Sequence, residues 1–292
     1  MRLSIGNSAF PLLSVKQAIR LAGLLEFDGF DVVLNGNSAG LRPEVVSRDL
    51  SGWSARVNEL LDANGLEASD VFCVPWTDFT TMAPNHPDGA QRAGGRALFR
   101  EMLDLASAVG APGVTMLPGV DWPNESHQHS LARAADELQS RATEARERGL
   151  GFSIEAHVGS VCHRPTDVLK LCNLAPELRL TLDYTHFVSQ GVAEQAIEPL
   201  APLARHVQVR GVAHDRLQAP LKDTTLDFER MVDVLHTAGY DGYITVEYIW
   251  VAWKRLNEVD VLSETVMLRD RLRAKFANEL WSYPGPTGIT DG

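Results

Sequence analysis

The stretch "SLARAADELQSRATEARERGLGFSIEAH", residues 130–157, contains the unit that decides the fold. Residues 130–149 carry apolar side chains at the spacing of an amphipathic helix, and Gly149 is typical of the left-handed residue that follows a helix end. Residues 151–157 then form a short apolar run, as a buried strand does. A helix, a glycine and a strand in this order indicate one unit of an alternating α/β fold.

This alternation continues along the chain, and eight units can be counted. Gly65, Gly110 and Gly239 end other helices in the same way. We predict strands at residues 2–6, 29–35, 68–74, 113–118, 151–157, 178–184, 205–211 and 242–249. We predict helices at residues 14–27, 51–65, 90–110, 130–149, 165–175, 192–204, 227–239 and 263–278.

Strict alternation of strands and helices implies right-handed crossovers and a parallel sheet. Eight units in a chain of this length match a single (β/α)8 TIM barrel, so the predicted fold class is α/β. We predict that the barrel covers residues 1–281 and that residues 282–292 form a loose C-terminal tail, because "YPGPTGITDG" resembles a frayed end. A doubly wound sheet is the second choice, since no GxGxxG motif follows the first strand.

Composition limits the kind of partner. The net charge is -11, with 27 basic and 38 acidic residues, which disfavours nucleic acid and anionic membranes and favours a small-molecule substrate. Cys73, Cys162 and Cys172 form neither a CxxC pair nor an even set, which favours a reducing compartment and hence the cytoplasm. No signal peptide and no run of about 18 apolar residues is found, so we expect a soluble protein. Whether it forms a homo-oligomer or a hetero-oligomer is left open.

Three acidic residues lie late in otherwise apolar strands: Glu155, Asp183 and Glu247. The active site of a TIM barrel lies at the C-terminal ends of its strands, so these side chains can converge there. Each pair at about 4 Å would cost roughly 4 kcal/mol at an effective dielectric near 20. Protons or a cation must relieve this repulsion. Oxygen ligands suit Mg²⁺ or Mn²⁺, and an added imidazole moves the preference toward Mn²⁺ or Co²⁺.

Other polar and aromatic residues follow the same strand ends. His157 and Arg210 share strand faces with Glu155 and Gln208, so they could contact a substrate. Four tryptophans follow the third, fourth and eighth strands, where their rings could stack on a sugar: Trp76, Trp122, Trp250 and Trp253. We choose Trp76 and Trp122 as the substrate-binding candidates.

At these residues the chain resembles the xylose isomerase-like TIM barrels, which include sugar phosphate isomerases, ketose 3-epimerases and inosose dehydratases. The resemblance rests on "IEAH" with Glu155, "LDYTH" with Asp183 and His186, and "YITVEY" with Glu247. It implies that these three acids hold one divalent ion, that His186 binds substrate, and that the two glutamates act as acid and base. In "HVQV", Gln208 stands where the resemblance would place a metal-binding histidine. A glutamine carbonyl oxygen can ligate Mg²⁺, Mn²⁺ or Ca²⁺, so Gln208 is the fourth predicted ligand.

The leading hypothesis is a divalent-metal-dependent isomerase or epimerase that acts on a sugar or related polyhydroxylated carbonyl compound through an enediolate. The first alternative is a lyase at the same site, which dehydrates an inosose or eliminates a group from an oxidised sugar or glycoside. His157 or His186 would then protonate the leaving group. The second alternative is a non-catalytic sugar-binding or subunit-forming barrel with a degenerate metal site. DNA repair is disfavoured by the acidic charge.

Overall fold

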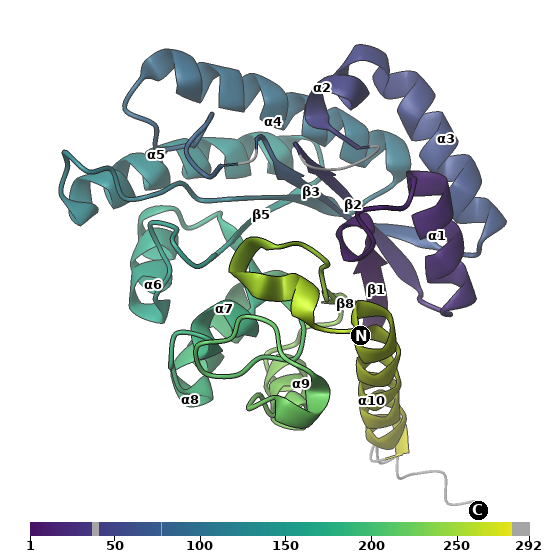
Figure 1. Ribbon diagram of the computed structural model, residues 1–292. Helices are drawn as coiled ribbons and strands as arrows, with labels where there is room; N and C mark the ends of the chain where they lie inside the picture. Colours follow the sequence, from purple (N-terminus) through teal and green to yellow (C-terminus); the bar gives the residue numbers. More distant parts are fainter. Residues whose placement is uncertain (37–40, 77, 282–292) are drawn as a thin grey trace, which may run out of the picture.

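The computed structural model describes residues 1–36, 41–76 and 78–281, and its strands close into a parallel barrel. Each strand pairs with the next, and β8 pairs with β1. Figure 1 shows the strands at the centre and the helices around them. The predicted single (β/α)8 TIM barrel is therefore confirmed. The strands are β1 (Arg2–Gly6), β2 (Gly29–Asn35), β3 (Glu67–Val74), β4 (Gly113–Met116), β5 (Gly151–Glu155), β6 (Arg179–Asp183), β7 (Ala204–Val209) and β8 (Tyr243–Val246).

The helices follow the strands in the predicted order. The α-helices are α1 (Val15–Leu24), α2 (Pro43–Val46), α3 (Leu50–Ala63), α4 (Gly89–Val109), α5 (His127–Glu147), α6 (Pro165–Leu174), α7 (Tyr184–Val188), α8 (Glu194–Ile197), α9 (Phe228–Thr237) and α10 (Val261–Trp281). The 3-10 helices are η1 (Asn7–Ala9), η2 (Ser47–Asp49), η3 (Glu198–Leu203), η4 (Leu221–Asp223) and η5 (Trp253–Glu258). The predicted tail, residues 282–292, lies outside the described residues.

The glycines at the helix ends take the predicted conformation. Gly65, Gly110, Gly149 and Gly239 have φ of +66°, +73°, +72° and +78°. Gly110, directly after α4, donates its backbone N–H to the carbonyl of Ser107, so it closes the last turn. A side chain at this φ would be strained, which is why glycine punctuates the chain here.

Several sequence predictions of local structure were wrong. The strands predicted to reach residues 118, 157, 211 and 249 end at Met116, Glu155, Val209 and Val246. The helix expected at residues 192–204 is a single turn, α8, followed by the 3-10 helix η3. Pro199 and Pro202 lack the backbone N–H that a continuous α-helix needs, and Pro202 lies inside η3. The strand expected to reach Tyr184 ends at Asp183, because the Asp183 side chain caps α7 by accepting the backbone N–H of Thr185.

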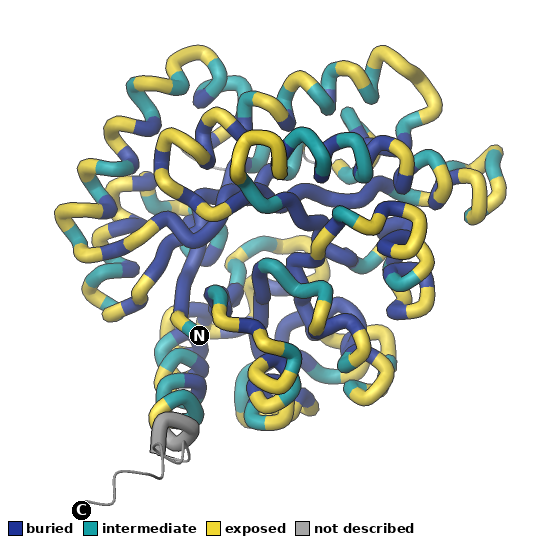
Figure 2. Tube along the Cα trace, turned by 180° about the vertical axis from the view of Figure 1, so that it is seen from behind, coloured by how far each residue is buried: buried dark blue, intermediate teal, exposed yellow. Residues whose placement is uncertain are grey.

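Burial follows the expected layers. Figure 2 shows the central strands as buried and the outer helix faces as exposed. Helix α9 illustrates the pattern, since its buried residues recur at the spacing of one helix face: Phe228, Met231, Val232 and Leu235. Across the part of the chain that the structure describes, no helix is both long and apolar enough to span a membrane.

The inside of the barrel is unusual because every strand contributes a buried polar residue to it, where TIM barrels mostly bury branched apolar side chains. We call this set the polar layer: Ser4, Asp31, Asp70, Thr115, Ser153, Thr181, His206 and Thr245. Its members are joined by hydrogen bonds, for example from Ser4 to Thr245 at 2.7 Å and from Ser153 to Thr181 at 2.7 Å. The polar layer forms the floor beneath the strand ends.

Candidate active site

Directly above the polar layer, the last four strands present polar residues again. On each of these strands, one polar residue lies two positions beyond the member of the polar layer. These residues are Glu155 on β5, Asp183 on β6, Gln208 on β7 and Glu247 directly after β8. All four are buried. One oxygen each of Glu155, Asp183 and Glu247 lies within 4.8 Å of the others, and we call these three residues the acidic cluster. The predicted convergence of the three acids therefore occurs.

Asp183 divides its two oxygens between structure and site. Its Oδ1 accepts the backbone N–H of Thr185 at 2.8 Å and the Thr185 hydroxyl at 2.5 Å, which starts helix α7. Its Oδ2 faces the acidic cluster and lies 2.8 Å from Nη2 of Arg210. The short helix α7 then brings His186, three residues later, back over the same oxygen at 3.4 Å.

His186 is oriented by the backbone. The N–H of Val158 donates to its Nδ1 at 3.2 Å, so Nδ1 is an acceptor and the ring carries its proton on Nε2. Nε2 in turn lies 3.1 Å from Oε1 of Glu155 and can donate to it. Burial acts to raise the pKa of Glu155, but the charge and hydrogen bond of His186, together with His157 and Arg210, lower that pKa to about 2. Glu155 is therefore an ionised carboxylate held in a fixed orientation.

Arg210 lies at the centre of the acidic cluster and is buried. Its Nη2 lies 2.8 Å from Oδ2 of Asp183 and 3.0 Å from Oε2 of Glu247. Its Nη1 donates to the backbone carbonyl of Glu247 at 3.1 Å, and its Nε donates to the Thr185 hydroxyl at 3.2 Å. The guanidinium group is therefore fully engaged with the protein, and it neutralises part of the acidic charge.

Two acceptor atoms of the site remain unsatisfied among the described residues. Oε1 of Gln208 is buried without a hydrogen bond, and Oε2 of Glu247 has the ion pair with Arg210 but no hydrogen bond. Burial raises the pKa of Glu247 well above its usual range, although Arg210 acts in the opposite direction. Buried acceptors without donors are costly, so both oxygens are suited to a cation or a substrate hydroxyl.

These donors fit a hard divalent ion. Three carboxylates and one amide oxygen come from four neighbouring strands, and oxygen donors of this kind suit Mg²⁺, Mn²⁺ or Ca²⁺. The unsatisfied Oε1 of Gln208 is the atom that an ion would use. Arg210 contacts two of the same carboxylate oxygens, so it shares them with any bound ion.

A cavity of about 260 Å³ opens above the acidic cluster. The predicted site residues Glu155, His157, His186, Arg210 and Glu247 line it, as does Trp76. Trp122 lies elsewhere: its Nε1 donates to Asn85 at 3.2 Å, and its ring contacts His86. Its role as a substrate residue stays a prediction without support from this cavity.

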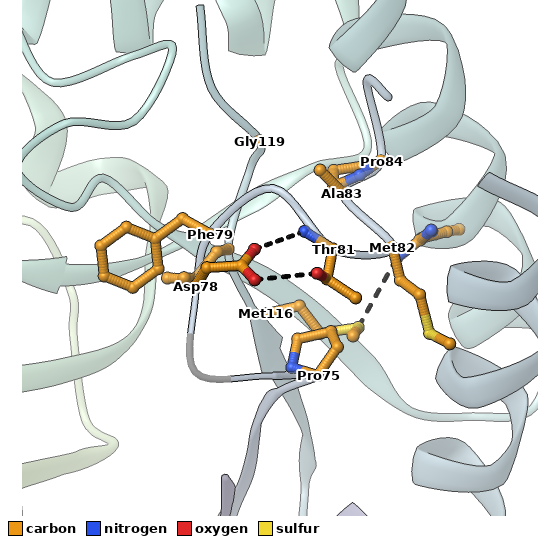
Figure 3. A pocket seen from close by; sticks show the side chains of 11 residues that line it. Pro75, Asp78, Phe79, Thr81, Met82, Ala83, Pro84, Met116 and Gly119 are labelled. Carbon is orange, nitrogen blue, oxygen red and sulfur yellow. Dashed lines mark hydrogen bonds between the residues drawn. The ribbon is translucent and has the colours of Figure 1, made fainter. Parts of the chain in front are cut away.

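An aromatic group covers one side of the cavity, and we call it the aromatic hood: Phe79, His157 and Trp253. The ring of His157 lies 4.5 Å from Phe79 and is stacked on Trp253 at 5.3 Å. Burial lowers the pKa of His157 to about 3, so the ring is neutral, with Nδ1 bound to the carbonyl of Val158 at 2.6 Å. In Figure 3, Phe79 and Met82 extend to opposite sides of the loop after β3.

The sequence analysis missed several residues of the cavity. Val33, Phe72 and Leu117 line it, but as apolar residues in apolar strands they could not be told from the core. Phe79 follows β3 in a loop without a recognisable motif. The signal that could have found them is position, because Val33, Phe72 and Leu117 also lie two residues beyond a member of the polar layer.

The model of the xylose isomerase-like TIM barrel family matches residues 19–270 of this chain. The chain belongs to this family. No curated protein matches the sequence. The resemblance that the strand-end motifs suggested is thus confirmed.

Several solved structures have the same fold as this chain. A D-psicose 3-epimerase from Clostridium cellulolyticum H10, solved with D-tagatose, has a TM-score of 0.75 at 13% identity, over 94% of this chain and 99% of that chain. The probable 3-DHS dehydratase AsbF from Bacillus anthracis has a TM-score of 0.69 at 13% identity, over 92% and 99%. The IOLI protein with a bound zinc atom has a TM-score of 0.71 at 13% identity, over 98% and 100%. At these identities the likeness shows the fold alone.

Proposed function

We propose that this chain is a divalent-metal-dependent isomerase or epimerase acting on a sugar or related polyhydroxylated carbonyl compound. The observation that carries the proposal is the pair Glu155 and Glu247, which come from β5 and the end of β8, lie within 4.8 Å of each other and line one cavity. Two carboxyl groups on one cavity can remove a proton from carbon and return one. The epimerases among the solved relatives support the same class of reaction.

The residues that would hold the ion are Glu155, Asp183, Gln208 and Glu247, with Mn²⁺ or Mg²⁺ preferred and Co²⁺ also suited. Such an ion supplies a Lewis acid that polarises the carbonyl and neighbouring hydroxyl oxygens of the substrate. Its identity is part of the proposal, and it rests on the oxygen donors alone.

In the proposed reaction, one glutamate takes the proton from the carbon next to the carbonyl, and the enediolate forms as that C–H bond breaks. The other glutamate protonates the opposite face, or the neighbouring carbon in an isomerisation, so that no net proton is lost. His186 donates from Nε2 to Glu155 and holds it in place. Arg210 fixes Asp183 and the backbone of Glu247.

A lyase is the second candidate, and the position of His186 favours it. His186 lines the cavity with its proton on Nε2, so it could protonate a leaving group after the same first proton removal. His157 also lines the cavity, but the proton of its neutral ring is bound to the carbonyl of Val158, which does not support the role predicted for it. AsbF, a solved relative, is described as a probable dehydratase. Elimination yields an enone that absorbs ultraviolet light, whereas epimerisation does not, which separates the two candidates.

The experiment that tests the proposal is a panel of ketoses and oxo-sugars in D₂O with Mn²⁺, Mg²⁺ or EDTA. We expect deuterium to enter the carbon next to the carbonyl when metal is present and not in EDTA. Exchange that EDTA leaves unchanged would contradict metal dependence. Binding of sugars without any exchange or turnover would favour the non-catalytic barrel.

The cytoplasmic location expected from the cysteines remains a prediction; all three are buried free thiols in the structure.

A further inference from the structure

The cavity has two unlike walls, and the difference follows the strand order. At the position above the polar layer, β5 to β8 supply the acidic cluster and Gln208, which together we call the polar wall. At the equivalent position, β1 to β4 supply Gly6, Val33, Phe72 and Leu117, none of which has a polar side chain. The polar residues that line the cavity on this side, Ser8 and Asn35, lie two positions further along the chain than Gly6 and Val33. In TIM barrels these strand ends are where polar substrate-binding residues are expected. The strand ends of β5 to β8 are therefore suited to the hydroxyl and carbonyl oxygens of a ligand, and the equivalent positions of β1 to β4 are not.

The apolar wall is a cluster of its own. Val33, Phe72 and Leu117 pack together apart from the main core, and Val74 and Phe79 pack against them. The three side chains are 5%, 5% and 8% exposed, and that remaining surface faces the cavity. Apolar surface in a cavity favours ligands that cover it with apolar atoms.

Aromatic side chains extend this wall to the mouth of the cavity. Trp76 and Trp253 line it and keep 49% and 41% of their surface exposed, which is high for tryptophan beside a buried site. Phe79 contacts Trp253 edge to face at 6.2 Å between ring centroids. Flat rings exposed in this way can pack on an aromatic group of a ligand.

The cavity also lacks a free positive charge. Among the described residues that line it, Arg210 alone carries a permanent positive charge. Its guanidinium group is already bound to Asp183, Glu247 and Thr185. A phosphate or carboxylate of a substrate would need such a cation or a free set of N–H donors. Apart from the proposed ion, which three carboxylates would surround, no described group of the cavity is therefore available to pair with an anionic substituent of the ligand.

We propose that the substrate is a neutral oxidised sugar that carries an aromatic or similar apolar substituent, so that its sugar half meets the polar wall and its substituent meets the apolar wall. The part of this inference that concerns the sugar half rests on the proposed function. The part that concerns the substituent rests on Val33, Phe72, Leu117 and the aromatic hood.

The test uses matched pairs of probes: methyl and phenyl 3-oxo-glucosides, the same pair of 3-oxo-galactosides, and fructose with its 6-phosphate. Binding is measured by calorimetry and turnover by ultraviolet absorbance and NMR, both with Mn²⁺ present. We expect the phenyl member of at least one pair to bind at least tenfold more tightly than the methyl member. We expect the phosphate to bind no better than fructose.

Leu117→Asn places a side chain of nearly the same size as leucine in the apolar wall but makes the wall polar. It should therefore reduce the preference for binding phenyl over methyl probes at least threefold. Leu117→Met keeps the wall apolar and should retain that preference. If Leu117→Asn does not fold, the phenyl preference of the unaltered protein still decides the question.

The outcomes separate the two proposals. Equal binding of phenyl and methyl probes, or tighter binding of the phosphate, would overturn this inference while leaving the proposed function intact. Phenyl-selective binding without turnover or exchange would support the inference and contradict the proposed function. Absence of binding by every probe would overturn the inference.

Discussion

The polar layer and the acidic cluster both bury carboxylates beside one arginine and one histidine, and they differ in how completely these carboxylates are bound. In the polar layer, Asp70 accepts hydrogen bonds from Arg205 at 2.8 Å and from the hydroxyl of Thr115. Asp31 is hydrogen-bonded to His206 at 2.9 Å and accepts hydrogen bonds from two further hydroxyl groups. In the acidic cluster, one arginine serves two of three acids and unsatisfied acceptors remain. Neighbouring positions on the same strands thus serve different purposes.

The pKa shifts do not divide between the two clusters, because burial also raises the pKa of Asp70 in the polar layer and His186 helps to lower that of Glu155 in the acidic cluster. Burial acts to raise the pKa of Asp31, but the charge and hydrogen bond of His206, with the hydroxyls of Ser69 and Thr245, lower that pKa, so an ion pair lies inside the polar layer. In the acidic cluster, burial prevails at Glu247 and raises its pKa well above the usual range. A satisfied cluster contributes to stability, whereas an unsatisfied one is available for a ligand.

The largest expected effect is on turnover, from Glu155→Gln and Glu247→Gln. Each keeps the shape of the side chain but removes the group that transfers the proton, so we expect turnover to fall by about two to four orders of magnitude. Glu247→Gln should change stability little, because burial already raises the pKa of Glu247. Glu155→Gln should lower stability, because the ionised Glu155 loses its charge and its bond with His186. Deuterium exchange and urea unfolding check the two halves of this prediction. A variant that exchanges at the original rate would show that its glutamate is not the proton-transfer group.

The next effect is on stability and compares Arg205→Met with Arg210→Met. Each removes the arginine from buried carboxylates, so each should lower the free energy of unfolding by about 3–5 kcal/mol. Mn²⁺ should restore much of the stability of Arg210→Met, because the ion and Arg210 share oxygens of Asp183 and Glu247. It should not restore Arg205→Met, since Asp70 has no place in a metal-binding group among the described residues.

Thermal unfolding with and without Mn²⁺ measures the stability of each variant. Arg216→Met, at an exposed arginine, serves as the control. Equal rescue of both variants, or of neither, would show that the two clusters do not differ in the way described above.

The sequence was sufficient for the fold and for much of the polar wall. Strands and helices follow local periodicity, and Glu155, Asp183 and Glu247 were found because an acid in an apolar strand is conspicuous. The polar layer was missed although it contains Asp31 and Asp70, because these acids lie before the C-terminal ends of their strands, where a site is expected. Its Ser and Thr residues are ordinary in strands, and their pairing depends on register, including the irregularities near Phe30 and Leu180. The contacts of Arg210 were not predictable either, because they depend on the turn that Asp183 starts after β6.

A smaller effect is expected at Gln208. Gln208→Leu removes the unsatisfied amide oxygen while keeping a similar volume, so we expect Mn²⁺ affinity to fall by about tenfold to a hundredfold, as is usual when a metal site loses a supporting group. Gln208→His should retain metal binding and move the preference toward Co²⁺ or Zn²⁺, since imidazole is the softer donor. Calorimetric titration of the three proteins checks both. Unchanged Mn²⁺ affinity in Gln208→Leu would remove Gln208 from the ligand set.

The smallest effect is expected at Asp78, which shapes the loop that carries Phe79. Its carboxylate accepts the backbone N–H and the hydroxyl of both Thr80 and Thr81, at 2.6 to 2.9 Å. The two contacts with Thr81 appear in Figure 3. Burial acts to raise the pKa of Asp78, but these hydrogen bonds lower it from 3.8 to about 2. The contribution of a carboxylate with a lowered pKa is present above its ordinary pKa and is lost only as the pH falls through about 2.

Asp78→Ala should therefore loosen the aromatic hood at every pH between about 5 and 9. We expect KM for the phenyl probe to rise about threefold, a change of roughly 0.6 kcal/mol in binding, with kcat and the free energy of unfolding nearly unchanged because the loop is exposed and remote from the reacting carbon. Asp78→Asn keeps one oxygen for the backbone N–H groups and should show a smaller rise. An equal rise in KM for the methyl probe would mean that the loop affects the polar wall, and that Phe79 does not contact the substituent of the ligand.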